Sequence, residues 1–394
     1  MTPSVHPFPA RMAPEIALAN LKDLRPGSTV LDPMTGSGTV ARQAVSLGHS
    51  ALGFDLDPLA VLISKVSTTK VADDTIASAC QRLLHEAAKL EPCSIALPWI
   101  DDSIPASEFV RYWFGGSQIS SLRQISYLLS EPERLEISTD AADVLRVALS
   151  RIIVTKRQCA SLAQDTSHSR PHRVSIESDY DVYKGFAQSV LAVRRRLAAM
   201  NGIGSAQIGS GDARDLKVVG DGTVDAVLTS PPYLNAIDYL RGHRLSLVWL
   251  GHKLEDLSAA RSASIGSERR PDEPIDQNFY ADMKGAMGEI NDLPRRYVGM
   301  IERYIADIYR MLAEVIRVMK AGTQATFVMG NSCLRGVFIH NSEALSVAAT
   351  KVGLTLLSRI ERELPPQHRY LPTPSVGALG KRMRSEVILT FAKP

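Results

Sequence analysis

The hydrophobic positions at the start of the chain indicate alternating strands and helices. Short β-branched and apolar runs at residues 28–31 and 51–54 flank a Gly-rich stretch and an amphipathic segment at 39–47. Together they predict a strand, a tight turn, a helix and a second strand. Such a βαβ unit implies a parallel sheet whose ligand lies at the carboxyl ends of the strands.

A second region with the same alternation occupies the later part of the chain. The expected elements are strands at 206–208 and 224–228, a long helix at 296–319, a buried strand at 323–329, and two final strands around 354–360 and 386–391. Parallel βα units closed by a terminal pair of strands predict an α/β sandwich.

Between these halves, residues 72–203 have helical periodicity and few β-branched runs. Helices are predicted at 74–90, 119–129, 141–153 and 183–200. We therefore expect a main domain made of residues 1–71 and 204–394, with residues 72–203 as a helical insertion. Residues 255–295 are polar and charged and are expected to form a mobile surface excursion.

Composition narrows the class of protein. The 394 residues exceed one typical domain, and the hydrophobic share of 45% with 22% charged residues excludes disordered and collagen-like chains. Neither a membrane span nor a signal peptide is apparent, so a cytoplasmic protein is expected. The 4 cysteines are widely spaced without a C-x-x-C pair, so neither a disulfide framework nor a metal site is expected. A formal net charge of +3 permits an anionic partner.

The turn from Asp32 to Thr39 follows the first predicted strand and opens a helix. Its glycines, Gly36 and Gly38, let the backbone come close to a ligand, while N–H groups and the positive helix end face that ligand. No G-K-[ST] sequence ends the turn, which argues against a P-loop. A dinucleotide or another nucleoside is the expected ligand.

Two acidic residues extend this expected nucleoside site. Asp55 ends the second strand, where a carboxylate accepts hydrogen bonds from ribose hydroxyls; capping the next helix is the alternative role for Asp55 and for Asp57. Asp212, in a turn after the third strand, is placed to meet an adenine amino group, although Gly-Asp turns are also ordinary loop chemistry.

The segment Thr229-Ser230-Pro231-Pro232-Tyr233 is the strongest signal for chemistry. A buried strand that ends in two prolines makes a rigid turn with carbonyl acceptors that neighbouring residues cannot all satisfy. The Ser230 hydroxyl and the Pro231 carbonyl can both hold an exocyclic NH2, and Tyr233 offers an aromatic face to an extruded base.

These motifs resemble those of DNA amino-methyltransferases. The turn at 32–39 looks like their S-adenosyl-L-methionine (AdoMet) motif, Ser230-Pro-Pro-Tyr233 looks like their catalytic motif, and residues 6–11 look like the segment that packs over the methionine end of AdoMet. Further similarity is seen at 330–332 and 382–386, so the resemblance covers about residues 1–65 and 205–394.

The resemblance implies a Rossmann-like class I methyltransferase sheet with AdoMet as cofactor. Its implied catalytic residues are Ser230, Pro231, Pro232 and Tyr233. Its implied cofactor-binding residues are Phe8, Pro9, Ala10, Asp32, Pro33, Thr35, Gly36, Ser37, Gly38, Thr39, Asp55, Leu56, Asp212 and Ala213. Double-stranded DNA is the implied partner, and a cognate restriction endonuclease is a further one.

In this family, Ser before Pro-Pro often accompanies methylation of cytosine N4, whereas Asp or Asn accompanies adenine N6. The resemblance therefore implies an N4-cytosine enzyme, with adenine N6 as the first alternative. An RNA guanine-N2 methyltransferase and a catalytically silent nucleic-acid-binding module are the others. A C5-cytosine mechanism needs a cysteine nucleophile, and the Pro92-Cys93 pair lies in the insertion, where Cys93 is expected to be structural.

Basic side chains suggest where DNA is bound. The stretch from Arg151 to Arg173 is rich in Arg, Lys and His and includes Arg170 and Arg173, which are candidate phosphate contacts. Arg241 and Arg244 follow the catalytic turn and are further candidates, as are residues 367–372 and 381–384. A solvated charged surface is the alternative for each of them. Residues 113–116 are expected to be insertion core.

Overall fold

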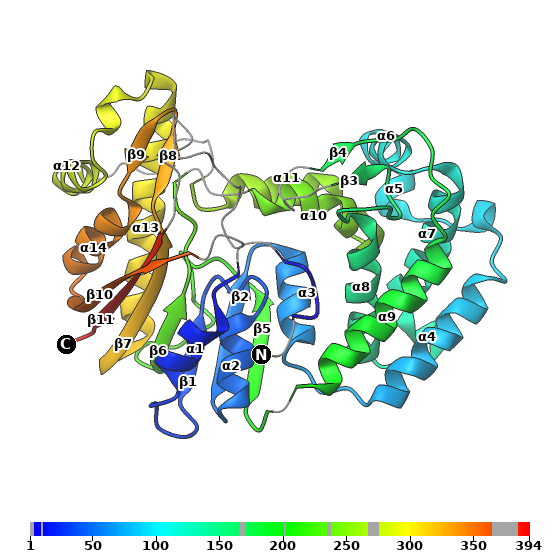
Figure 1. Cartoon of the computed structure of the whole chain (residues 1–394), viewed down its shortest axis with the longest axis horizontal. Coiled ribbons are helices and arrows are strands. Elements are labelled where there is room, and N and C mark those ends of the chain that lie inside the picture. The colour runs from blue at the N-terminus through cyan, green and yellow to red at the C-terminus, as the bar shows by residue number, and fades with distance from the viewer. Residues whose placement is uncertain are drawn as a thin grey trace.

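The structure of the chain is a computed structural model that describes residues 4–8, 11–164, 171–200, 202–234, 238–266, 276–364 and 385–394. Its centre is a seven-stranded sheet with the order β10-β11-β7-β6-β1-β2-β5 (Figure 1). The strands are β1 (Thr29–Asp32), β2 (Ser50–Asp55), β5 (Ser205–Ser210), β6 (Val224–Thr229), β7 (Met319–Gly330), β10 (Thr355–Glu363) and β11 (Ser385–Ala392). The predicted α/β fold is confirmed.

Strands β5, β2, β1, β6 and β7 run parallel to one another, and β11 runs antiparallel to both of its neighbours, β7 and β10. Because the chain leaves β1, β2, β5 and β6 at the same edge of the sheet, the turns that follow these strands are brought together. This edge is where parallel sheets bind ligands.

Alternation along the strands distributes apolar side chains to both faces of the sheet. Val30 of β1 packs with Leu21 and Ala44 from the helices on one face, whereas Leu31 packs on the other face with Ile305 and Leu312. A strand that is apolar on both faces is typical of the centre of a parallel sheet. The covering helices are α1 (Pro14–Leu21) and α2 (Thr39–Ser46) on the first face and α13 (Val298–Val318) and α14 (Asn341–Lys351) on the second.

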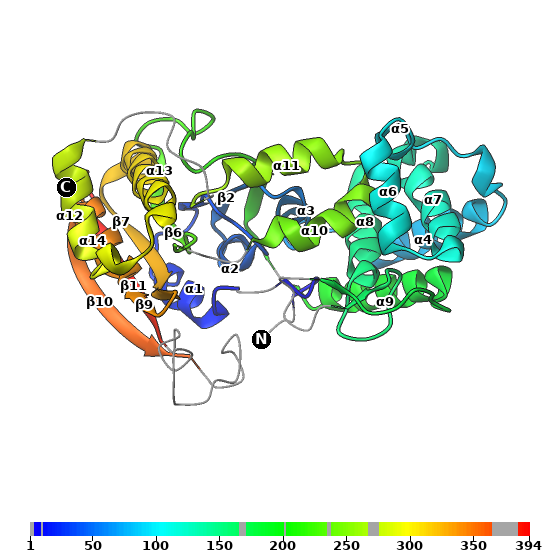
Figure 2. The same cartoon turned by 90° about the horizontal axis from the view of Figure 1, so that it is seen from above.

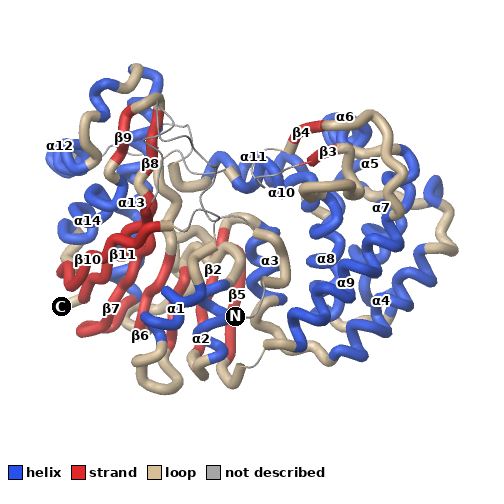
Figure 3. The backbone as a smooth tube through the Cα atoms, in the orientation of Figure 1, coloured by secondary structure: helices blue, strands red, loops and turns tan. Residues whose placement is uncertain are grey.

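Residues 73–198 form a helical lobe beside the sheet (Figure 3). Its helices are α4 (Asp73–Ala87), α5 (Pro98–Asp101), α6 (Ile104–Trp113), α7 (Gly116–Ser130), α8 (Thr139–Ile153) and α9 (Val182–Ala198), with the 3-10 turns η1 (Pro92–Ser94) and η2 (Pro132–Leu135). Side chains of Ser103, Ser138 and Asp181 cap three of these helices, as expected for such residues. The predicted helices at 74–90, 119–129, 141–153 and 183–200 are confirmed.

A short hairpin of β3 (Ala163–Gln164) and β4 (His172–Arg173) follows α8. Residues 239–263, which follow the Pro-Pro turn, form α10 (Tyr239–Leu247), η3 (Val248–Leu250) and α11 (Leu254–Ala263) and pack against this helical lobe. Trp249 is fully buried there and its ring meets Phe114 edge-on at 5.1 Å. Figure 2 shows α10 and α11 running from the sheet to the lobe. The lobe therefore has two sources in the sequence, 73–198 and 239–263.

Helix α3 (Pro58–Val66) lies between the sheet and the helical lobe. It contacts β2 and β5, and its Leu59, Ile63 and Val66 belong to the same apolar core as the lobe helices. Asp57 caps this helix by accepting from the Leu59 N–H. The two parts of the molecule are thus joined by a shared core.

The expectation for residues 255–295 is wrong for the described part of its second half. Residues of α12 (Gln277–Ala286) and η4 (Ile290–Asp292) are buried in the sheet's core, among them Phe279, Met283, Met287 and Ile290. Phe279, Met283 and Met287 recur every four positions, the spacing of one helix face. This segment, followed by η5 (Arg295–Tyr297), is therefore a covering layer, and the small hairpin of β8 (Ser332–Leu334) and β9 (Val337–Ile339) lies beside it.

None of the described helices is long and apolar enough to cross a membrane. Nor do three His, Cys, Asp or Glu side chains gather as metal ligands anywhere in the described ranges.

Candidate active site

The Gly-rich turn at the end of β1 has the backbone that its glycines predict. Gly36 and Gly38 have φ of +49° and +76°, in the left-handed region that favours glycine. A Cβ on Gly38 would lie 2.8 Å from the Ser64 Cα of α3, whereas one on Gly36 would contact only the Phe8 ring, at 3.6 Å. Gly38 therefore lets α3 approach the turn, and Phe8 covers it.

Other predicted residues of the turn are enclosed by it. Pro33, Thr35, Ser37 and Thr39 are buried, and the Thr35 hydroxyl shares a 3.0 Å hydrogen bond with Ser64. The same contacts that order the turn also fasten it to α3. Pro9 and Ala10 lie outside the described residues.

Asp32 links the Gly-rich turn to the Pro-Pro turn at residues 229–233. Its buried carboxyl group accepts a 2.7 Å hydrogen bond from the Thr229 hydroxyl and one of 3.2 Å from the Met34 N–H. Burial raises the pKa of Asp32 to about 7, against the lowering effect of these two donors. Thr229 immediately precedes Ser230, so the end of β6 and the end of β1 are held together by one side-chain contact.

Asp55 lies at the end of β2, beside the Gly-rich turn. One carboxylate oxygen accepts from the Gly36 N–H and the other from the Asp57 N–H, each at 2.9 Å. Burial, followed by the charge of Asp57, raises the pKa of Asp55 to about 6. Each carboxylate oxygen can accept a further hydrogen bond, so the fixed side chain is suited to a pair of hydroxyl donors. Leu56, the next residue, is half-buried.

Asp212 also lies at this edge, because the Gly211 N–H donates to the Asp55 carbonyl at 3.1 Å. However, both of its carboxylate oxygens already accept from the Arg214 guanidinium, at 2.6 and 2.9 Å. Arg214 also donates to the fully buried Asp307 of α13 at 2.6 Å. The pKa of Asp212 is lowered by Arg214 despite burial. Arg214 and Asp307 are missing from the sequence prediction, and Ala213 between the partners is buried.

An aromatic cluster over the Gly-rich turn was also missed. The Phe8 ring lies 5.4 Å from Tyr239 and 5.3 Å from His243 of α10, measured between ring centroids. The buried His243 Nδ1 is 2.5 Å from an Asp57 carboxylate oxygen. Asp57 therefore has two roles, because it caps α3 with one oxygen and binds His243 with the other. The sequence around His243 does not indicate its pairing with Asp57, because the two residues are brought together only by the tertiary fold.

The Pro-Pro turn, residues 229–233, presents Ser230 to solvent at the same edge. The Ser230 hydroxyl donates to the Val328 carbonyl of β7 at 2.9 Å, which leaves its lone pairs available as acceptors. Pro231 is buried, whereas Pro232 and Tyr233 are half-buried. The turn is fixed on its buried side by Asn341, a fully buried residue whose side-chain oxygen accepts a 3.2 Å hydrogen bond from the Leu234 N–H.

The predicted DNA-contacting arginines lie in different environments. Arg173 is exposed on β4 with its guanidinium 4.8 Å from the Tyr112 ring centroid, and Arg241 is exposed on α10. Arg244 is half-buried over the Phe109 ring of α6 at 5.1 Å, and burial lowers its pKa. Arg244 therefore packs between α10 and the helical lobe rather than facing solvent. Arg170 and the stretches at 367–372 and 381–384 lie outside the described residues.

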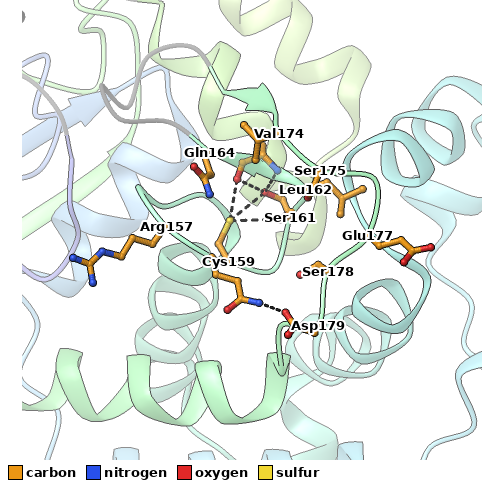
Figure 4. Close-up of a pocket in the computed structure, with 12 residues that line it drawn as sticks. Arg157, Cys159, Ser161, Leu162, Gln164, Val174, Ser175, Glu177, Ser178 and Asp179 are labelled. Atoms are coloured by element: carbon orange, nitrogen blue, oxygen red, sulfur yellow. Dashed lines mark hydrogen bonds between the residues drawn. The ribbon is translucent and has the colours of Figure 1, made fainter.

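A cavity of about 620 Å³ opens beside the β3–β4 hairpin (Figure 4). Its lining is mostly polar, and Arg157 and Glu177 lie at opposite ends of the group. The hairpin contacts the catalytic segment, since a Cβ on Gly242 of α10 would lie 3.7 Å from Pro171. Phe114 is buried and Trp113 packs on the lobe core, as predicted. Cys93 is exposed in η1, so burial does not support the structural role expected for it.

Comparison with known proteins gives two curated relatives. A type II methyltransferase of Kocuria varians, M.MvaI, is 22% identical over 419 aligned positions that cover 99% of this chain and 90% of the relative. Another, M.BsoBI of Geobacillus stearothermophilus, is 23% identical over 61% of this chain and 51% of the relative. The chain is similar to type II methyltransferases.

No protein-family model matches the chain. Solved structures with some likeness to it include a geranyl diphosphate methyltransferase in complex with AdoMet, which is 9% identical over 97% of this chain and 84% of that one, with a TM-score of 0.35. A SAM-dependent methyltransferase from Methanosarcina mazei, covering 97% of this chain and 98% of that one, has the same identity and score. The strand order of this chain's own sheet is the firmer basis for its fold class.

Proposed function

We propose that this protein is a DNA methyltransferase that transfers a methyl group from AdoMet to the exocyclic N4 of a cytosine flipped out of duplex DNA. The proposal is carried by one observation: the Gly-rich turn, Asp55 and the Ser230–Tyr233 turn meet at one edge of the sheet, joined by the Asp32–Thr229 hydrogen bond. The similarity to two type II methyltransferases supports it.

The residues present fit AdoMet. Asp55 offers an oriented carboxylate for the ribose hydroxyls, the turn at Gly36 and Gly38 is a glycine cradle, and the Phe8 ring covers that cradle. Asp212 and Ala213 border the expected adenine position. Arg214 fixes the Asp212 carboxylate, whose Oδ2 accepts one hydrogen bond from Arg214 and, like the Asp55 oxygens, can accept a further one from an amino group. When bound, AdoMet supplies an electrophilic methyl group on its sulfonium.

The chain's own part in the reaction is to hold and orient an amine. The Ser230 hydroxyl donates its hydrogen bond to the Val328 carbonyl, so toward the target amine its oxygen acts as an acceptor. In the proposed complex it accepts one N–H of the amine, and the Pro231 carbonyl accepts the other. Two acceptors fix the amine plane and direct the nitrogen lone pair toward the methyl donor. The half-buried Tyr233 ring is the proposed stacking surface for the flipped base. No cysteine lies in the turn from Thr229 to Tyr233, so a C5 mechanism is not proposed.

The helical lobe is the proposed DNA-recognition region. Its β3–β4 hairpin contacts α10 and presents Arg173 on the exposed Tyr112 ring, next to the exposed Val174 and Ile176. Such a combination of cation and apolar surface suits a nucleic acid. Arg173→Ala should weaken DNA binding and lower the salt slope by about one unit, with AdoMet binding unchanged. Arg194→Ala, which removes an α9 arginine that binds Asp73 of α4, is the matched control. A cognate restriction endonuclease stays a prediction of the resemblance.

Nucleoside mass spectrometry tests the product directly. DNA from cells that express the chain should contain N4-methylcytosine, and long-read sequencing should place it in one short sequence. Tyr233→Ala should raise the activation free energy of methyl transfer by on the order of 1 to 3 kcal/mol, because stacking on the base is lost. The affinity for AdoMet should stay near normal. Ser230→Ala should act on turnover in the same direction.

The possible products separate the parts of the proposal. N6-methyladenine would keep the cofactor and the site residues but overturn the interpretation of Ser230. Finding 5-methylcytosine would refute the direct-transfer mechanism. DNA left unmodified by a purified protein that also fails to bind AdoMet would refute the function as a whole.

A further inference from the structure

The described N-terminal segment, residues 4–8, is a strap that spans the two parts of the molecule. Val5 is fully buried in the core of the helical lobe, and Phe8 lies against the Gly-rich turn of the sheet. In Figure 2 this dark-blue strap lies between the sheet and the lobe. One end of it is therefore anchored in the lobe while the other covers the proposed AdoMet site.

Arg151 of α8 holds the strap. Its guanidinium donates to the Val5 carbonyl at 2.5 Å. The sequence placed Arg151 in the basic stretch expected to meet DNA, yet the side chain is turned inward and half-buried. It is thus a contact within the protein.

The setting of Arg151 is unfavourable for a purely structural arginine. No carboxylate of the described residues forms an ion pair with it, and its buried Nε has no hydrogen-bond partner. Burial and the nearby charge of Arg196 lower its pKa to about 10, so it remains a cation at neutral pH. A desolvated charge without a counterion costs stability, which suggests that its carbonyl contact serves another purpose.

The strap's other end meets groups that belong to the site. Phe8 touches the position of Gly36, whose N–H is bound by Asp55, and its ring packs on Tyr239 and His243. His243 in turn is bound by Asp57. Displacing the strap would therefore uncover the turn that cradles the cofactor.

We propose that Arg151 is a positioning residue through which the helical lobe holds the strap closed over the AdoMet-binding turn. The lobe then governs cofactor retention as well as any contact with DNA. This inference rests on the proposed function, since it assumes that the ligand under the strap is AdoMet.

The test compares Arg151→Met, which keeps the apolar stem and removes the donors, with the wild-type full chain. AdoMet dissociation, followed by stopped flow, should become about 10-fold faster, as expected for the loss of one hydrogen bond from a charged donor. Phe8→Ala should have a similar effect, and the double variant should lose little more than either single one, because both changes act through the strap. Arg151→Lys should restore part of the retention.

Arg146→Met is the matched control. It removes an arginine from the same helix, one that binds Asp143 and the Leu129 carbonyl, so it perturbs the lobe without touching the strap. Hydrogen exchange at the backbone amides of Val5, His6 and Phe8 in the AdoMet-free protein gives an independent measurement. Exchange there should accelerate in Arg151→Met and stay unchanged in Arg146→Met.

The outcomes are distinguishable from those of the proposed function. A wild-type chain that does not bind AdoMet refutes both. A wild-type chain that binds AdoMet, with Arg151→Met matching it in dissociation rate and in exchange of the strap, refutes this inference alone. Equal acceleration by Arg146→Met and Arg151→Met would also overturn it, because the effect would then belong to the lobe in general.

Discussion

The carboxyl groups of Asp32 and Asp55 at the sheet edge differ in how much hydrogen-bonding capacity their surroundings leave for a ligand. Asp32 and Asp55 both have raised pKa values, of about 7 and about 6, because both are removed from water. Asp32 is committed to Thr229 and the Met34 N–H, whereas Asp55 is oriented by backbone donors and retains free acceptor capacity. Only Asp55 is therefore placed to sense a bound ligand directly through its protonation state.

AdoMet affinity should depend on the protonation of Asp55. Its pKa of about 6 means that the carboxylate form, which the ribose hydroxyls need as acceptor, is lost as the pH falls through 6. Calorimetric titrations between pH 5 and 8 should show weaker binding at the acidic end. Asp55→Asn should bind more weakly at pH 8, by roughly 1.5 to 3 kcal/mol, and should lack this pH step. An unchanged step in the variant would assign the titration to another group.

Glycine at position 38 is required by a neighbour as well as by the backbone. Gly38 and Gly27 share a φ of +76°, but a Cβ at position 27 has open space whereas one at 38 would meet Ser64 at 2.6 to 3.0 Å. Gly27→Ala should cost about 1 kcal/mol from backbone strain alone. Gly38→Ala should cost about 1 to 3 kcal/mol more, from overlap with α3. Urea denaturation of the two variants measures the difference, and equal losses would rule out the steric contribution.

At the scale of helices and strands, the spacing of apolar residues was sufficient to predict some elements but was misinterpreted for others. The seven strands of the central sheet and the long helix α13 were predictable because each has its own repeat of buried positions, whereas the short strands β3, β4, β8 and β9 were not predicted. The Gly-rich and Pro-Pro turns were recognisable because their backbones demand particular residues. The segment at 276–293 was predicted as surface because its flanks are charged. Its apolar positions, Phe279, Met283 and Met287, nevertheless recur at a helical spacing that could have been used.

Contacts between distant elements could not be predicted. Arg214 pairs with Asp307 across 93 positions, and His243 pairs with Asp57 across 186. Nothing local to these residues marks the partnership, because the distances are set by how α10 and α13 dock. The same holds for Arg151, whose local sequence indicates a charged surface while its tertiary setting is enclosed.

Helix α12 should contribute to stability as a core element. Met283 is fully buried, so Met283→Ala should lower the free energy of unfolding by about 2 to 5 kcal/mol. Asn278→Ala, an exposed change on the same helix, should stay within about 0.5 kcal/mol. Chemical denaturation of both variants checks this. If Met283→Ala left the free energy of unfolding unchanged, α12 would be a surface element and not part of the core.

The whole molecule has two lobes but a continuous core between them. Helix α3 contributes apolar side chains to the helical lobe while packing on β2 and β5 of the sheet. The strap adds a second connection through Val5, and Trp99 of α5 donates to the Val248 carbonyl of η3 at 2.8 Å. The lobes are therefore expected to unfold together, although the chain is long enough for two independent units.

The distribution of tryptophan makes this cooperativity measurable. All 3 tryptophans, Trp99, Trp113 and Trp249, lie in the helical lobe, whereas the proposed AdoMet site lies on the sheet. AdoMet at 100 times its Kd should stabilise the folded chain by about 2.7 kcal/mol. The thermal transition seen by tryptophan fluorescence should therefore rise with AdoMet and coincide with that seen by circular dichroism. If the midpoint of the fluorescence transition did not change with AdoMet, the two lobes would unfold separately.

Because the helical lobe is assembled from two separate stretches of sequence, it cannot be exchanged as a single cassette. Residues 73–198 transplanted alone into another scaffold would leave behind α10 and η3, and the surface that Leu245 and Trp249 cover would become an exposed apolar patch. Such chimeras should aggregate. Hybrids that carry both stretches, together with a matching α3 face, should stay folded. Exchanging the lobe between relatives of this chain therefore requires two coordinated segment replacements, one before β5 and one after β6 in the sequence.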